Sequence, residues 1–184
     1  MAIKIALLGL ETVVSGVLKI IKNNQKKFKQ TSGEEIVIKK ALVCNLKKHQ
    51  NMAKEVELTT NFDDILHDAE IKIVVELMGG LHPAKEYISD ALNAGKNVVT
   101  ANKDLMATFG SELIALATKN KCDLMYDASV AGGIPILRTL STSYASDKIS
   151  EIQGIINGTT NYILSRLIQL TMSLEKTLPT TLSF

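Results

Sequence analysis

A strand, a sharp turn and a helix open this chain, and together they constrain its fold more than any other feature. The apolar run from Ile3 to Leu8 predicts a buried strand, and the segment from Val13 onward repeats apolar residues at helical spacing. Between them lies Gly9-Leu10-Glu11-Thr12-Val13-Val14-Ser15-Gly16. A turn of this kind leaves free backbone N–H groups at a helix N-terminus, which is the arrangement that binds the pyrophosphate of a dinucleotide.

Two residues of this turn depart from the dinucleotide-binding pattern G-x-G-x-x-G. The pattern places glycine at positions 9, 11 and 14, where the chain has Gly9, Glu11 and Val14. The second glycine lets the backbone approach the phosphates, and the third lets the helix pack close to the strand. Glu11 instead brings a negative charge to the place of an anionic cofactor. The residues alone leave two interpretations open: a modified nucleotide loop, or an ordinary buried strand–helix unit.

Strands and helices alternate along the rest of the first two thirds of the chain. Further apolar runs predict strands at residues 36–44, 71–77, 97–100 and 122–126, separated by helical patterns. The run at 71–77 is nearly continuous, as in a parallel sheet that is buried on both faces. The alternation predicts an α/β fold with a doubly wound, Rossmann-like parallel sheet and right-handed crossovers. A glycine pair follows the strand at 71–77, at the edge where open α/β sheets bind ligands.

The pattern changes after residue 135. We expect one domain over residues 1–135 and an incomplete second domain over residues 136–184. Residues 149–156 predict a strand, and the polar turn that follows them leads into a helix. One strand and one helix cannot bury both faces of a second sheet, so this segment is interpreted as the beginning of an α+β domain.

Composition limits the class of protein. At 184 residues with 46% hydrophobic content, the chain can bury one good core and part of a second. No apolar run reaches the roughly 18 residues of a transmembrane helix, and the first apolar run is interpreted as a core strand, not a signal peptide. Cys44 and Cys122 are too few for a disulfide framework and indicate thiols in a reducing compartment. We therefore expect a cytoplasmic protein with no membrane partner.

Positive charge is concentrated in the first third of the chain. Residues 1–54 carry eleven lysines and three acidic residues, whereas the remainder carries ten basic and sixteen acidic residues. The lysines are scattered over predicted helix and loop positions without interleaved aromatic side chains. This distribution is typical of solvated helix ends, so we expect no nucleic-acid partner.

Three further motifs, taken in order with the opening turn, give the chain a specific resemblance. They are Val98-Val99-Thr100-Ala101-Asn102-Lys103, Ala128-Ser129-Val130-Ala131-Gly132-Gly133-Ile134-Pro135 and Gly154-Ile155-Ile156-Asn157-Gly158-Thr159-Thr160-Asn161-Tyr162. Over about residues 1–176 the chain closely resembles homoserine dehydrogenase. The resemblance implies the NAD(P)-dependent interconversion of aspartate 4-semialdehyde and L-homoserine, in threonine and methionine biosynthesis. It also implies a cytoplasmic homo-oligomer, usually a dimer, with a nucleotide-binding domain followed by a substrate and dimerisation domain.

The resemblance assigns roles to individual residues. It places the NAD or NADP cofactor against Gly9, Leu10, Thr12, Val13, Met78, Gly79 and Lys103. Lys103 would be catalytic, since a cation at the junction of nicotinamide and substrate polarises an aldehyde oxygen or stabilises the alkoxide that forms from it. Asn157, Gly158 and Thr159 match a turn that faces the nicotinamide and the substrate.

The resemblance also implies a structural sodium ion. Its ligands would be Asp127 and the main chain around Val130, Gly132 and Ile134, because carboxylate and carbonyl oxygens suit a hard cation. Asp127 stands where the family usually has glutamate, whose side chain is one methylene longer.

Two departures from the family pattern affect the expected function. At the end of the second strand, Cys44 and Asn45 provide neither an arginine for a 2′-phosphate nor an acid for a ribose hydroxyl. Lys47 and Lys48 offer partial compensation for a phosphate, so the choice between NAD and NADP stays open. The substrate-binding carboxylates and the second lysine of the family lie beyond the turn at 157–162 and have no match here. We expect an impaired enzyme; the alternative is a non-catalytic truncated remnant or accessory dimerisation module.

Overall fold

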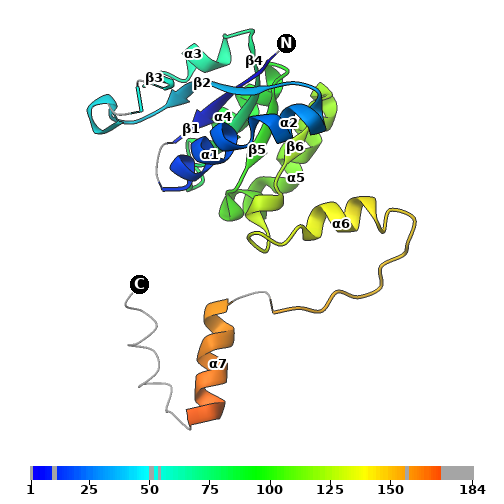
Figure 1. Cartoon of the computed structure of the whole chain (residues 1–184). Coiled ribbons are helices and arrows are strands. Elements are labelled where there is room, and N and C mark those ends of the chain that lie inside the picture. Colours follow the sequence, from blue (N-terminus) through cyan, green and yellow to red (C-terminus); the bar gives the residue numbers. More distant parts are fainter. Residues whose placement is uncertain (1, 10–11, 50–51, 54, 156–157, 171–184) are drawn as a thin grey trace. The chain divides into compact units, whose positions relative to one another are not determined.

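The computed structural model describes residues 2–9, 12–49, 52–53, 55–155 and 158–170 (Figure 1). The chain divides into two compact units, Met1–Arg138 and Thr139–Phe184. The first unit is an α/β domain, and the second contributes the helix α7, Gly158–Leu170. The domain boundary expected at residue 135 is not tested by this division and stays a prediction.

A parallel sheet of six strands forms the first unit (Figure 1). In chain order the strands are β1 (Ile3–Leu8), β2 (Ile36–Leu42), β3 (Glu57–Thr59), β4 (Ile71–Glu76), β5 (Asn97–Thr100) and β6 (Leu124–Met125). Their order in the sheet is β3-β2-β1-β4-β5-β6, and every neighbouring pair is parallel. This confirms the doubly wound parallel sheet. The order reverses between β1 and β4, where Leu8 pairs with Glu76.

Helices lie between most of the strands, and one more follows β6. They are α1 (Thr12–Asn23), α2 (Gln25–Ser32), α3 (Asp63–Leu66), α4 (Ala84–Asn93), α5 (Lys103–Asn120) and α6 (Ile136–Thr142), with 3-10 turns at Leu46–His49 and Asp127–Ser129. No described helix combines the length and the apolar composition that a membrane span requires. The described residues also contain no group of three His, Cys, Asp or Glu side chains placed to hold a metal ion.

Both faces of the sheet are covered. Along β1 the side chains alternate, because successive residues of a strand point to opposite faces. Ala6 and Leu8 belong to the core that α4 and α5 complete, whereas Ile5 and Leu7 pack with α1. All four are at most 4% exposed, which explains why the strands are almost continuously apolar in sequence.

The expected strand at residues 149–156 is wrong over residues 149–155, which form no strand in the structure. Ile149, Ile152 and Ile155 are 45%, 66% and 77% exposed. The described residues of this unit contain no second strand with which this segment pairs, and a lone strand has no partner for its backbone N–H and C=O groups. Residue 156 lies outside the described part of the chain.

Candidate functional site

The site is centred where the strand order reverses. Gly9 follows β1 with a φ of +92°, and its N–H donates to the carbonyl of Leu42 at the end of β2 at 3.1 Å. A Cβ at this position would lie 3.2 Å from both Cα and Cγ of Met78, in the loop that follows β4. Glycine is therefore required here for two reasons: the left-handed backbone and the close approach of the neighbouring loop.

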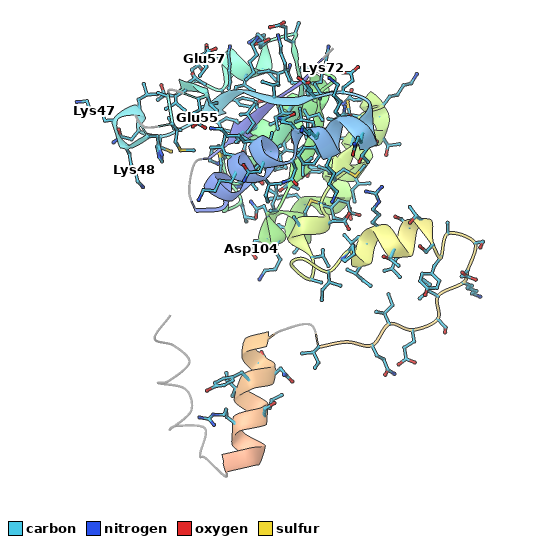
Figure 2. All side chains as sticks on the ribbon, viewed as in Figure 1. Lys47, Lys48, Glu55, Glu57, Lys72 and Asp104 are labelled. Atoms are coloured by element: carbon cyan, nitrogen blue, oxygen red, sulfur yellow. The ribbon has the colours of Figure 1, made fainter. Side chains whose placement is uncertain are left out.

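A cavity of about 510 Å³ opens at this carboxyl edge of the sheet. Gly9, Met78 and Gly79 line it together with residues that follow β2, among them Cys44, Lys48 and His49. Its volume lies within the range of small-ligand and cofactor pockets. None of the described residues that line it is acidic. Figure 2 shows Lys47 and Lys48 projecting from the turn that follows β2.

Some of the residues expected to contact the cofactor lie together in the structure, and the cofactor contacts themselves stay predictions. Gly9, Met78 and Gly79 are brought together in one cavity. Thr12 and Val13 form the first turn of α1. Leu10 and Glu11 lie outside the described residues, so the expectation that the Glu11 carboxylate meets the cofactor stays a prediction.

Glu76, the last residue of β4, is a site residue that the sequence pattern did not indicate. Its side chain is fully buried, although glutamate is almost never buried without partners. Oε1 accepts hydrogen bonds from the backbone N–H groups of Met78 at 2.7 Å and Gly79 at 3.3 Å. Oε2 accepts from the hydroxyl of Thr100, at the end of β5, at 2.6 Å. The carboxylate therefore fixes the loop that lines the cavity.

The hydrogen bonds continue from Thr100 to the start of α5. The backbone N–H of Asn102 donates to Thr100 Oγ1 at 3.0 Å, and Asn102 Nδ2 donates to the carbonyl of Gly80 at 2.6 Å. Asn102 Oδ1 caps the helix by accepting from the N–H of Leu105 at 3.1 Å. We call Glu76, Thr100 and Asn102 the Glu76 network. All three side chains are buried, so the hydrogen bonds that join Glu76 to Thr100 and Thr100 to Asn102 are shielded from competition with water.

Lys103 is the first residue of α5 and is exposed. It lines a second cavity, of about 360 Å³, with residues that include Met106, Tyr126 and Ser129. The structure therefore does not place Lys103 in the cavity of Gly9 and Met78. The Glu76 network is the described link between the two.

The remaining predicted residues are placed as follows. Asp127 Oδ1 accepts from the backbone N–H of Arg138 at 3.1 Å, so its carboxylate binds the first turn of α6. Val130, Gly132 and Ile134 follow in the segment that leads into α6, and Gly132 has a φ of +59°.

The turn expected to face the nicotinamide and the substrate is only partly described. Gly158 begins α7. Asn157 and the Thr159 side chain lie outside what the structure describes, so the turn at 157–159 and the sodium ion stay predictions.

Charged side chains form a separate cluster at the amino end of the sheet. Lys39 Nζ lies 2.5 Å from Asp68 Oδ2 and 2.6 Å from Glu70 Oε2. Hydrogen bonding to Lys39 lowers the pKa of the Asp68 carboxyl below its ordinary value, despite its burial. The same contacts raise the pKa of Lys39. Lys96 is buried and donates to the carbonyls of Asp68 and Ile71 at 2.7 and 3.0 Å; burial lowers its pKa.

Comparison with known proteins identifies the family. Residues 9–127 match the NAD-binding domain of homoserine dehydrogenase, and residues 135–181 match the homoserine dehydrogenase domain that accompanies it. The chain belongs to the homoserine dehydrogenase family. This confirms the resemblance that the sequence motifs indicated.

Individual relatives support the same assignment. The homoserine dehydrogenase of Bacillus subtilis is 51% identical over 170 residues, which is 91% of this chain and 39% of that protein. The homoserine dehydrogenase of Lactococcus lactis is 48% identical over 170 residues. The crystal structure of the homoserine dehydrogenase from Thiobacillus denitrificans superimposes with a TM-score of 0.89 at 41% identity, over 98% of this chain and 42% of that one. The chain thus spans about two fifths of the length of these relatives.

Proposed function

We propose that this chain is the cofactor-binding part of a homoserine dehydrogenase and takes NAD(P)H in the cavity at the end of β1 and β4. The observation that carries the proposal is the contact of Gly9 with Met78 where the strand order reverses. Open α/β sheets bind dinucleotides at such a switch point. The complete reaction interconverts aspartate 4-semialdehyde and L-homoserine, a step toward threonine and methionine.

The residues of this chain would serve the reaction in two ways. Gly9 and Gly79 place no side chain between the ends of the strands and the cavity, where the pyrophosphate of a cofactor would lie, and a bound nicotinamide would supply or accept the hydride. Lys103 stands in the first turn of α5, where the positive end of the helix dipole adds to the charge of its ammonium group. The helix dipole and the ammonium group would together stabilise negative charge on the carbonyl oxygen of a substrate.

The cavity favours NADPH over NADH. An enzyme that prefers NADH commonly places an acid after the second strand to bind the ribose hydroxyls. Here no described lining residue is acidic, and Lys48 and His49 stand beside the end of β2 instead. A 2′-phosphate would gain a cationic partner in this place.

Two further proposals come from the family alone. A sodium ion would lie at Asp127 with main-chain oxygens of Val130, Gly132 and Ile134, and sodium-dependent protection of residues 127–134 from proteolysis would test it.

The second proposal is a homodimer in the cytoplasm. It would cover apolar side chains of the second unit such as Ile152 and Ile155, which are exposed in the single chain. Light scattering after size-exclusion chromatography would test this: we expect self-association of the whole chain, and a monodisperse monomer would contradict it.

The isolated chain is expected to lack turnover. The cavity beside Lys103 has no acidic residue among its described lining residues, so nothing there holds the ammonium group of the substrate. Positioning of the reacting groups supplies roughly 7–11 kcal/mol of barrier lowering. Turnover that Lys103→Ala abolishes would contradict this expectation and would show that the chain carries the complete site.

The test of the cofactor site is a calorimetric titration of NADPH and NADH into two proteins. The wild-type chain is expected to bind weakly, because Glu11 and Val14 replace two glycines of the dinucleotide-binding pattern, and a negative charge at position 11 would repel the phosphates. The double variant Glu11→Gly/Val14→Gly, called the glycine-restored variant, is expected to bind NADPH much more tightly. Absence of binding in the glycine-restored variant would overturn the cofactor proposal. Micromolar binding by the wild-type chain would instead overturn the role given to Glu11 and Val14.

A further inference from the structure

Glu76 is hydrogen-bonded to elements that line two different cavities, the one at Gly9 and the one at Lys103, and it is not among the described residues that line either of these two. Its carboxylate accepts from the 78–80 loop on one oxygen and from Thr100 on the other. The loop lines the cofactor cavity, and Thr100 leads to the start of α5. A buried carboxylate that binds donors from two elements fixes the distance between those elements, because moving either one leaves a buried charge unpaired.

The hydrogen bonds close into a circuit. From Glu76 they run through Thr100 Oγ1 to the backbone of Asn102, and from Asn102 Nδ2 to the carbonyl of Gly80. Gly80 belongs to the same loop that Glu76 binds. Asn102 also caps α5, whose first residue is Lys103. The loop and the helix start are thus held by the same side chains.

We propose that Glu76 is a positioning residue that holds the 78–80 loop and the first turn of α5 as one unit, so that cofactor contacts on the loop and the position of Lys103 are coupled. The roles of the cofactor cavity and of Lys103 rest on the proposed function. The coupling itself rests on the hydrogen bonds of the Glu76 network alone.

The junction of the circuit is the hydroxyl of Thr100, which donates to Glu76 and accepts from Asn102. Thr100→Val keeps the side-chain shape and removes both hydrogen bonds, whereas Thr100→Ser keeps the hydroxyl. The chain offers a matched control. Thr59 is also buried, and its Oγ1 donates to Asp64 Oδ2 at 2.5 Å and accepts from the backbone N–H two residues later at 3.0 Å, in part-buried hydrogen bonds. Thr59→Val therefore removes the same chemistry away from the loop and α5.

The experiment measures amide hydrogen exchange in the protein without cofactor. In Thr100→Val we expect exchange at Met78 and Leu105 to become about tenfold faster than in the wild type, since both N–H groups bind members of the Glu76 network. Thr100→Ser should restore the slow exchange, and Thr59→Val should leave both amides unchanged. Equal effects of Thr100→Val and Thr59→Val on these two amides would overturn the proposal, because they would reflect only a loss of global stability.

A second readout follows the cofactor. In the glycine-restored variant we expect Thr100→Val to weaken NADPH binding about fivefold, and Thr59→Val to leave it unchanged. Should Thr100→Val fail to fold, Asn102→Asp cuts the circuit elsewhere: it keeps the cap oxygen for Leu105 and removes the amide donor to Gly80. We then expect faster exchange at Gly79, and unaltered exchange there would contradict the coupling. Because exchange is measured without cofactor, failure of NADPH to bind would overturn the proposed function and leave the coupling testable.

Discussion

At the amino end of the sheet, charged side chains neutralise one another, whereas at the carboxyl end a single buried carboxylate is bound by uncharged donors. Lys39 and Lys40 share Asp68 at the amino end, and Lys4 pairs with Glu70. At the carboxyl end Glu76 accepts only from backbone N–H groups and a hydroxyl. The first arrangement satisfies its own charges and stabilises the fold. The Glu76 carboxylate instead holds a glycine-containing loop that lines a cavity. The carboxyl end of the sheet is therefore the end suited to bind a ligand.

The largest expected effect is at the carboxyl end. Glu76→Leu leaves two part-buried backbone N–H groups and the buried Thr100 hydroxyl without their acceptor, and a buried polar group that loses its partner costs roughly 1–3 kcal/mol. We expect the free energy of unfolding in urea to fall by about 3 kcal/mol or more. Glu57→Leu is the control, because Glu57 is exposed at the start of β3 and its loss should cost less than about 0.5 kcal/mol. Equal losses would show that the burial of Glu76 has no special role.

A smaller loss of stability is expected at the amino end. The Asp68 side chain is 11% exposed and is paired with Lys39 and Lys40. Asp68→Asn keeps the shape and removes the charge, so we expect the free energy of unfolding to fall by roughly 1–2 kcal/mol. NADPH affinity, measured in the glycine-restored variant, should stay the same. A change in affinity similar to that of a carboxyl-end variant would remove the distinction between the two ends.

Acid should weaken the amino end specifically. The pKa of Asp68 is lower in the folded chain than its ordinary value of 3.8, so its contribution to stability is complete above that value and is lost as the pH falls toward the folded-state pKa. We expect the stability difference between the wild type and Asp68→Asn to be constant near neutral pH and to shrink below about pH 4. Urea unfolding at a series of pH values measures this difference; a difference that grows on acidification would contradict the assignment.

The smallest expected effect concerns the choice of cofactor. In the glycine-restored variant, Lys48→Ala should weaken NADPH binding by about fivefold, which is roughly 1 kcal/mol, and change NADH binding little. Lys72→Ala is the matched control, since Lys72 is an exposed lysine of β4 that does not line the cavity (Figure 2). Equal weakening of NADPH and NADH by Lys48→Ala would show that this lysine does not contact a 2′-phosphate.

The sequence correctly predicted those parts of the fold that depend on residues close together in the chain. The apolar run of β1 and the glycine that follows it predicted a strand, a sharp turn and a ligand edge, and the structure confirms the strand and gives Gly9 a left-handed φ. The family motifs led to the correct family. These features depend on neighbouring residues, so they are visible without knowledge of the fold.

The remaining features depend on contacts between distant segments. In the sequence Glu76 is a single charged residue within the apolar run at 71–77, and only the pairing of β4 with β5 brings Thr100 to its carboxylate. The strand β3 is three residues long and was not predicted, because its only support is pairing with β2. The apolar residues from Ile149 to Ile155 predicted a strand for the opposite reason: the pattern was present, but the described chain provides no strand to pair with it.

A map of the amides that respond to NADPH would show directly where the cofactor binds. In the glycine-restored variant, amide chemical shifts are followed by NMR as NADPH is added. We expect saturable shifts at Gly9, Met78 and Gly79, at the carboxyl end of the sheet, and none at Asp68 or Lys96, at the amino end. Saturable shifts confined to the amino end, or no shifts at Gly9 and Met78 at saturating NADPH, would contradict the central claim that the reversal between β1 and β4 forms the cofactor site.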